Sequence, residues 1–368
     1  MASDPSSIVI GGGFVLAFVF GAVAQKTNFC TMGAISDIVN MGHWARMRMW
    51  MLAVAVAVVG AGALDLAGLV DLSKAVTQQP TLRWLSLVLG GLVFGVGMTL
   101  SGGCANRNLV RAGGGSLRSL VVLLVMAVAA YMTMKGLFAQ GRASWLDPVA
   151  LPLGESGWAD QGLPTAIARL TGLAEPTARG LAMALVALPL LVFVLADRAF
   201  RRNNPQAIGG VILGLVITAG FYLSGAIGFG ENPETLEDGF FATNSRALES
   251  MSFVGPLAYG LELLMLWTDA SLHLTLGIAS VLGVVAGAAV VALATGRFRW
   301  EGFASVSDLR QQLFGAVLMG FGGVTAIGCT VGQGMTGIAT LALGSFIAVA
   351  AIVAGCYATL KVLIAREG

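Results

Sequence analysis

The chain has 368 residues, of which 57% are hydrophobic and only 11% charged, against about 25% charged in an ordinary soluble domain. So little charge cannot cover a soluble surface, and a net charge of +2 is too small for a nucleic-acid footprint. A soluble enzyme, a disordered chain and a nucleic-acid binder are therefore excluded. Glycine contributes 51 residues, about twice average usage, without the three-residue period of collagen. The composition predicts an all-α polytopic membrane protein with many small positions.

Charge-free stretches locate the membrane helices, because a charge at bilayer depth is costly and a spanning helix needs about 20 apolar residues. They predict about nine crossings, at residues 5–25, 49–69, 84–103, 117–137, 180–196, 207–223, 272–295, 311–327 and 341–363. A shorter apolar segment, 251–267, carries Glu262. We expect it to enter and leave on one side, because another crossing would break the parity of the second half.

Lysine and arginine clusters predict the orientation, because cytoplasmic loops carry an excess of both residues. The basic clusters lie at residues 46–48, 198–202, 297–310 and 361–366, and the acidic or mixed loops lie at 65–71, 147–175 and 231–249. We therefore expect the N-terminus outside and the C-terminus in the cytoplasm. Trp44 and Trp50 flank the first cluster and are interpreted as interface residues. The first helix lacks a basic n-region and is longer than the apolar core of a signal peptide, so we expect it to be retained.

The two halves of the chain resemble each other. Residues 90–104 align without gaps on residues 315–329, and residues 13–22 align more weakly on 210–219. The strong match shares Gly90/Gly315, Gly95/Gly320, Gly97/Gly322, Gly103/Gly328 and Cys104/Cys329. The alignment predicts a first repeat of four spans at 1–138, an outer loop and connector helix at 139–205, and a second repeat of four spans at 206–368.

A single connector helix between two four-span halves inverts the second half. Inverted repeats are the usual build of transporters, with the substrate path at the repeat interface. The alternative is that glycine-rich membrane helices resemble each other by composition alone.

Three of the four cysteines share one sequence context. Cys30, Cys104 and Cys329 each follow a predicted membrane helix and precede small or polar residues suited to begin another short helix, whereas Cys356 is expected to pack. This pattern is typical of a broken or re-entrant helix, whose irregular backbone must be buried in protein or line a wet cavity. The N-terminus of the restarting helix would attract an anion. The alternative for any one of them is a small buried hydrophobe.

The cysteines give no local support for a metal or redox centre. No C-x-x-C pair occurs, so a thioredoxin-type site, a zinc ribbon and an iron–sulfur cluster are not indicated. No P-loop, GxGxxG or paired-carboxylate motif occurs either. We expect a permease rather than an enzyme, without a cofactor, a metal or a nucleic-acid partner.

The motifs NFCTMGAISD at 28–37, SGGCANRN at 101–108 and GCTVGQG at 328–334 resemble those of the YeeE/YedE family of bacterial sulfur transporters. The resemblance covers essentially the whole chain. It implies an hourglass-like inverted repeat in the bacterial inner membrane, and uptake of thiosulfate that three cysteines pass along by S–H hydrogen bonds. It also suggests that a cytoplasmic sulfur-carrier protein of the TusA or rhodanese type receives the cargo. The expected substrate-binding residues are the three cysteines with their neighbours: Cys30, Thr31, Gly103, Cys104, Ala105, Gly328, Cys329 and Thr330.

The chain departs from the family pattern at Ile327, where other members often have glycine, and at residues 105–108. Because the family also contains members linked to selenium metabolism, these departures leave the exact substrate open. The alternative hypotheses are a selenium-species transporter of the same family and a membrane thiol or redox subunit. Whether the protein is a channel or an ion-coupled carrier is also open.

Neutral thiols suit a transport path for a dianion. Arginine or lysine at a constriction would form charge-assisted bonds about twice as strong as neutral ones and slow release. A thiol is a weak donor, so several in series permit both binding and release.

Other polar residues have two interpretations each. Asp37 and Asn106 either cap the short helices or lie at the interface, and Arg107 and Arg111 are expected to be positive-inside anchors rather than anion guides. Glu262, Asp269 and His273 form either a proton relay or a cluster at the outer interface, which is the favoured interpretation.

Overall fold

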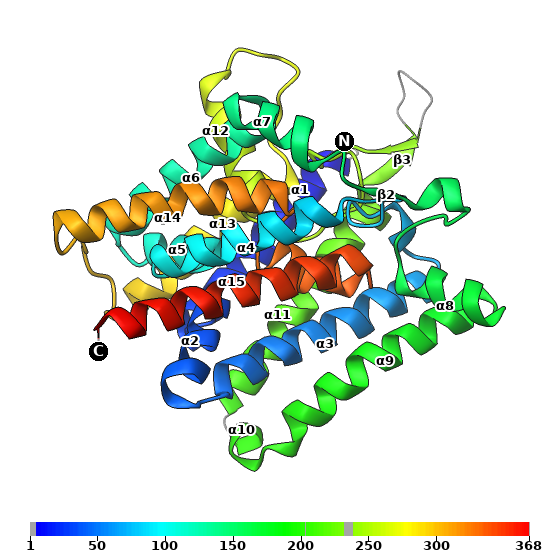
Figure 1. The fold of residues 1–368 in the computed structure, drawn as a ribbon, viewed down its shortest axis with the longest axis horizontal. Helices are drawn as coiled ribbons and strands as arrows, with labels where there is room; N and C mark the ends of the chain where they lie inside the picture. Colours follow the sequence, from blue (N-terminus) through cyan, green and yellow to red (C-terminus); the bar gives the residue numbers. More distant parts are fainter. Residues whose placement is uncertain (1–4, 203, 232–237, 368) are drawn as a thin grey trace.

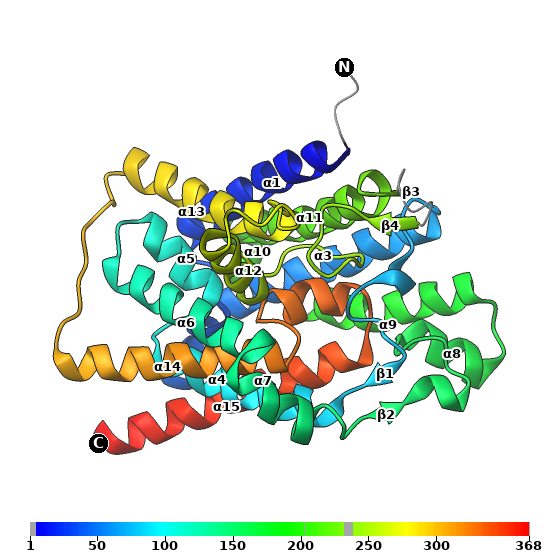
Figure 2. The ribbon, with the colours of Figure 1, turned by 90° about the horizontal axis from the view of Figure 1, so that it is seen from above.

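The computed structural model describes residues 5–202, 204–231 and 238–367. Residues 232–237 of the acidic loop predicted at 231–249 lie outside the described residues. Most long helices run lengthwise between two ends of the molecule (Figure 1). The loop between α13 and α14 lies at the same end of the molecule as the C-terminal end of α15. β2 and β3 lie toward the opposite end (Figures 1 and 2).

Helices account for nearly all of the regular structure. Those before the connector are α1 (Pro5–Thr27), α2 (Thr31–Met41), α3 (Ala45–Leu66), α4 (Trp84–Leu100), α5 (Ala105–Gly113), α6 (Leu117–Lys135), α7 (Leu137–Gly141) and α8 (Leu163–Thr171). The connector is α9 (Glu175–Ala196), followed by α10 (Arg198–Arg202), α11 (Asn204–Tyr222), α12 (Val254–Met265), α13 (Leu276–Ala294), α14 (Val306–Thr325) and α15 (Leu343–Glu367). Short 3₁₀ or π turns are η1 (Leu72–Lys74), η2 (Arg142–Leu146), η3 (Leu153–Ser156), η4 (Leu223–Ile227) and η5 (Gly332–Gly337).

Two small antiparallel ribbons lie in the loops. β1 (Thr81–Leu82) pairs with β2 (Leu151–Pro152), and β3 (Phe229–Glu231) pairs with β4 (Asp238–Phe240). The first joins loop segments that are far apart in the sequence, the second joins neighbouring segments, and neither forms a sheet layer.

Eight segments of the described chain are helical, long and apolar enough to cross a membrane: Pro5–Met41, Ala45–Leu66, Trp84–Gly113, Leu117–Lys135, Glu175–Ala196, Pro205–Ile227, Leu276–Ala294 and Leu343–Arg366. They coincide with eight of the nine predicted crossings and confirm an all-α polytopic membrane protein. The other predicted crossing, 311–327, lies in α14, whose first turns carry Asp308 and Arg310, so it stays a prediction. The apolar segment predicted at 251–267 is the 12-residue helix α12.

The long helices pack in pairs that recur between the two halves. α1 packs along α13 as α11 packs along α3, and α4 packs along α15 as α14 packs along α6. α4 also packs against α14, and α1 against α11. Figure 2 shows α1 with α13 on one side of the molecule and α4 with α14 and α15 on the other. Exchanging α1, α3, α4 and α6 with α11, α13, α14 and α15 reproduces the same pairs of neighbours.

Glycines let α4 and α14 approach each other closely. A Cβ on Gly97 would lie 2.7 Å from the Gly315 carbonyl oxygen, and one on Gly322 would lie 2.6 Å from the Gly90 oxygen. Nearest neighbours of this kind are backbone atoms that cannot move aside. Glycines shared by the sequence repeat therefore form the contact between the two matching helices.

Ion pairs at both of its ends join the connector helix α9 to α3. Arg179 pairs with Asp65 near one end, and Asp197, just beyond α9, pairs with Arg48 near the other. The outward side of α9 is apolar and exposed, as expected of a helix in contact with lipid: Leu181, Leu185, Leu188, Val192 and Leu195.

Candidate functional site

The chain breaks in the same way before each of the three cysteines. A residue with positive φ lies two positions before each one: Asn28 (55°), Gly102 (67°) and Ile327 (56°). Cys30 and Cys104 then take extended backbone and cap the starts of α2 and α5. After Cys329 the chain enters the π turn η5. At Cys30 and Cys104, a left-handed residue ends one helix and an extended residue starts the next.

Backbone N–H groups three residues further on face these sulfur atoms. The Gly33 N–H donates to Cys30 Sγ at 3.3 Å, and the Gly332 N–H donates to Cys329 Sγ at 3.4 Å. At Cys104 the matching N–H, that of Arg107, lies close to the thiol but closes no capping hydrogen bond. An N–H on a sulfur lone pair leaves the S–H proton free to donate elsewhere.

The structure brings the predicted residues of both halves together. The Cys30 sulfur lies next to the thiol and the N–H of Cys104, and Thr330 lies beside the Cys104 thiol. Cys30 is 5% exposed, Cys104 1% and Cys329 0%, and all are free thiols. Cys356 is also free and buried, but it accepts a hydrogen bond from Thr99 and belongs to the α4–α15 contact.

Several buried polar atoms beside the thiols lack a hydrogen-bond partner within the described chain. They are Thr31 Oγ1, Thr330 Oγ1, Trp50 Nε1 and both amide atoms of Asn106. Thr31, Trp50 and Thr330 line one small cavity together. A buried polar group left unpaired costs about 1–3 kcal/mol. A polar guest between the thiols would supply the missing partners.

Trp50 and Asn106 are members of this cluster that are not among the substrate-binding residues expected from the sequence. The interpretation of Trp50 as an interface residue is wrong, because it is only 8% exposed and packs in the core. Asn106, 1% exposed, lies in the first turn of α5. Its place directly after the Cys104-Ala105 pair is a sequence signal that could have included it.

The remaining predicted site residues flank the cysteines. Gly103 and Gly328 come directly before Cys104 and Cys329, and Ala105 is the fully buried first residue of α5. Gly328 has φ of 155°, which favours glycine. This conformation lets the backbone turn directly before Cys329.

The thiol cluster has a cavity on one side and basic residues on the other. A cavity of about 180 Å³ reaches Gly328, Gly332 and Thr336 around the Cys329 break. On the side of α2 and α5, Arg107 Nη2 donates to Asn28 Oδ1 at 3.3 Å, and Arg46 pairs with Asp37.

The acidic residues noted near 262–273 do not form one cluster. Glu262 is buried and pairs with Lys135 at 2.5 Å, whereas Asp269 is exposed and accepts from Ser271. Glu262 and His273 both line a polar cavity of about 820 Å³. A relay among the three carries no support from these contacts.

The fold and the site together define a polytopic membrane protein with a closed thiol site at the meeting point of its two halves. The pattern of the sulphur transport family matches residues 26–358, so the chain belongs to this family. The family consists of transporters, not enzymes.

Two relatives cover nearly the whole chain. A protein of Spirochaeta thermophila named thiosulfate transporter TsuA is 28% identical over 351 residues, which are 92% of this chain and 94% of the relative. A protein of Escherichia coli with the same name is 26% identical over 360 residues, 95% of this chain and 93% of the relative.

Proposed function

We propose that this protein takes up thiosulfate, or a closely related sulfur-containing anion, by way of Cys30, Cys104 and Cys329. The observation that carries the proposal is the cluster of buried free thiols beside buried polar atoms without partners. The two relatives named thiosulfate transporters support the same substrate class.

The thiols act as weak, neutral donors in series. Thiosulfate is a dianion with a soft terminal sulfur, and its hydration must be replaced without trapping it. The backbone N–H groups on Cys30 and Cys329 occupy sulfur lone pairs, so each S–H proton faces the anion. The hydroxyls of Thr31 and Thr330 add neutral donors. Several weak bonds in sequence let the anion leave each position as easily as it arrives.

The same proposal includes an inverted repeat, with residues 1–138 and 206–368 as its halves and 139–205 as the connecting part. The reciprocal helix pairs support it, because α4 meets α14 and α1 meets α11 as matching elements should across a two-fold axis. The protein lies in the bacterial inner membrane with its N-terminus outside. The position of the basic α13–α14 loop at the same end as the close of α15 fits a cytoplasmic C-terminus (Figure 1).

On the cytoplasmic side, a small sulfur-carrier protein of the TusA or rhodanese type receives the anion. Arg46, Arg107 and Arg111 lie near the α2 and α5 breaks and give this side a positive field that suits a departing anion.

Uptake of labelled thiosulfate by cells that lack their own thiosulfate transport tests the proposal. Cys104→Ala or Cys329→Ala should each abolish uptake at normal membrane expression, because one donor in the series is lost. Cys356→Ala should retain uptake, since that thiol lies in a packing contact with Thr99. Wild-type uptake by either of the first two variants would contradict the cysteine relay.

The same preparation separates the alternatives. Preferential uptake of a selenium-containing anion over thiosulfate would favour a selenium-species transporter. Activity that requires a Cys30–Cys104 disulfide would instead favour a membrane redox subunit.

A further inference from the structure

The cavity next to the Cys329 break adjoins a wider polar cavity, with which it shares two lining residues. The first, which we call the access cavity, has a volume of about 180 Å³ and is lined by Glu249, Tyr259, Gly328, Gly332 and Thr336 among others. It shares Asn244 and Tyr259 with the wider cavity of about 820 Å³. The wider cavity is lined by the basic side chains of Lys135, Arg246 and His273 and by the carboxylates of Asp238 and Glu262, the second of which is paired with Lys135.

Glu249 is the one charged residue among the described residues that line the access cavity. It lies between β4 and α12, outside the candidate membrane spans. Its carboxylate accepts a hydrogen bond from Ser245 Oγ at 2.8 Å, and its carbonyl oxygen accepts one from Ser224. The neighbouring Leu248 forms main-chain bonds with Lys74 and Val76, so the segment is fixed against η1.

The groups that surround Glu249 leave its charge uncompensated. None of the ion pairs within the described chain involves it. The titratable or charged groups on the elements around it are Tyr259 and Glu262 of α12, Lys135 of α6, Lys74 of η1, Arg246 of its own segment and His273 of the next loop. Lys135 is paired with Glu262, and Lys74 is paired with Asp71.

Burial raises the pKa of Glu249 to about 7, against hydrogen bonds from Ser245 and the Asn244 N–H, which lower it. The carboxyl group is therefore mostly neutral below that pH and mostly ionised above it.

We propose that the access cavity is the route by which the anion reaches Cys329, and that the protonation of Glu249 controls it. Ionised Glu249 repels a dianion inside a narrow cavity. Neutral Glu249 removes that repulsion and offers an O–H donor to the anion. The proposal rests on the proposed transport of a thiosulfate-like anion and deepens it, because it adds a titratable carboxyl group to the three thiols.

Thiosulfate uptake into proteoliposomes tests this, measured over a range of pH that brackets 7, with equal pH inside and outside. Wild-type uptake should fall as the pH rises through about 7, by about tenfold per pH unit well above it, because the neutral fraction of the carboxyl falls in that way. Glu249→Gln keeps a neutral donor at every pH, so its uptake should stay high and lose this dependence. Asp269→Asn is the matched control, because Asp269 is an exposed carboxylate that lines neither cavity. This variant should keep the wild-type profile.

Ser245→Ala is an independent test, because it should shift the pH dependence of uptake. It removes a hydrogen bond that stabilises the ionised form, so the midpoint of the uptake profile should move to higher pH. This variant decides the matter where Glu249→Gln folds poorly.

The proposal would be overturned by a flat wild-type profile, by a wild-type profile in Glu249→Gln, or by an unchanged midpoint in Ser245→Ala. A folded Glu249→Gln protein that is inactive at every pH would overturn it too. A wild-type protein without uptake at any pH would contradict the proposed function instead.

Discussion

Each break in the chain depends on one residue that tolerates left-handed backbone. Gly102 adopts this conformation without steric cost, and asparagine is among the residues that adopt it most readily. Ile327 is different, because a β-branched side chain at φ of 56° is strained. The strain falls directly before Gly328 and Cys329, at the third break. It is held in place by the Gln333 side chain, which donates to the carbonyl groups of Ala326 and Ile327.

Asn28 allows the backbone contribution to be measured by itself. Asn28→Ala should be less stable than Asn28→Gly by about 1 kcal/mol, because a Cβ clashes in the left-handed conformation. Both variants lose the hydrogen bond from Arg107, so their difference isolates the backbone. The midpoint of thermal unfolding of the purified protein in detergent reports it. Equal midpoints for the two variants would show that residue 28 leaves the left-handed conformation without cost.

The sequence is sufficient to predict the three cysteines as site residues, but not all of the residues that surround them in the fold. Cys30, Cys104 and Cys329 share neighbours along the chain, and this regularity is local. Trp50 belongs to α3, far from each break in sequence, and reaches Thr31 and Thr330 only through helix packing. Glu249 likewise lies in a loop without a motif. Such residues become visible only when burial and hydrogen bonding are known.

At the scale of helices, hydropathy predicts the helices that cross the membrane but few of the other elements. Charge-free runs located eight spans, because charges are costly in the bilayer. They indicated no structure at α8, α10 or the two β-ribbons, which lie in loops where water and protein can satisfy the backbone. The first turns of α14 carry charges, so its hydropathy is lower although it packs along α4 and α6.

Close packing of α4 on α14 makes a substitution test with a built-in control. Gly97→Ala should lower stability by about 1–3 kcal/mol, because the new Cβ would lie 2.7 Å from the backbone of Gly315 and Met319. Gly180→Ala in α9 meets no atom within 4 Å and should leave stability unchanged or raise it by up to about 1 kcal/mol. Unfolding midpoints of both variants in one detergent are the measurement. Similar effects of the two substitutions would contradict a glycine-dependent crossing.

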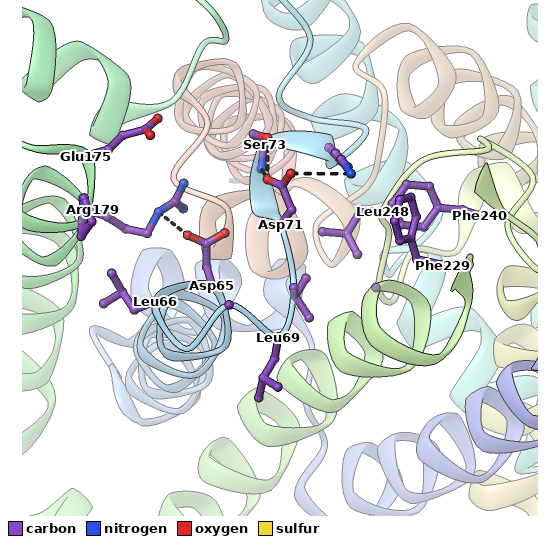
Figure 3. A pocket seen from close by; sticks show the side chains of 15 residues that line it. Asp65, Leu66, Leu69, Asp71, Ser73, Glu175, Arg179, Phe229, Phe240 and Leu248 are labelled. Carbon is purple, nitrogen blue, oxygen red and sulfur yellow. Dashed lines mark hydrogen bonds and ion pairs between the residues drawn. The ribbon is translucent and has the colours of Figure 1, made fainter. Parts of the chain in front are cut away.

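At the scale of the whole molecule, the connector and both halves line one common cavity. This cavity, of about 580 Å³, is lined by the end of α3, by Glu175 and Arg179 of the connector, and by Phe229, Phe240 and Leu248 of the second half (Figure 3). Figure 3 shows Arg179 reaching from α9 to Asp65 of the first half. The packing of α4 on α14 and of α1 on α11 holds the two halves together directly. The Asp65–Arg179 ion pair acts separately, because it joins the connector to α3.

The Asp65–Arg179 pair should therefore stabilise the molecule as a coupled unit. Both side chains are mostly buried, at 15% and 11% exposed, so Asp65→Asn or Arg179→Gln alone leaves one charge without its partner. Each single variant should unfold at a lower temperature than wild type. The double variant should recover part of the loss, with a coupling of about 1–3 kcal/mol, because neither charge remains. Unfolding midpoints of the four proteins complete the cycle. Strictly additive losses would mean that Asp65 and Arg179 do not stabilise each other.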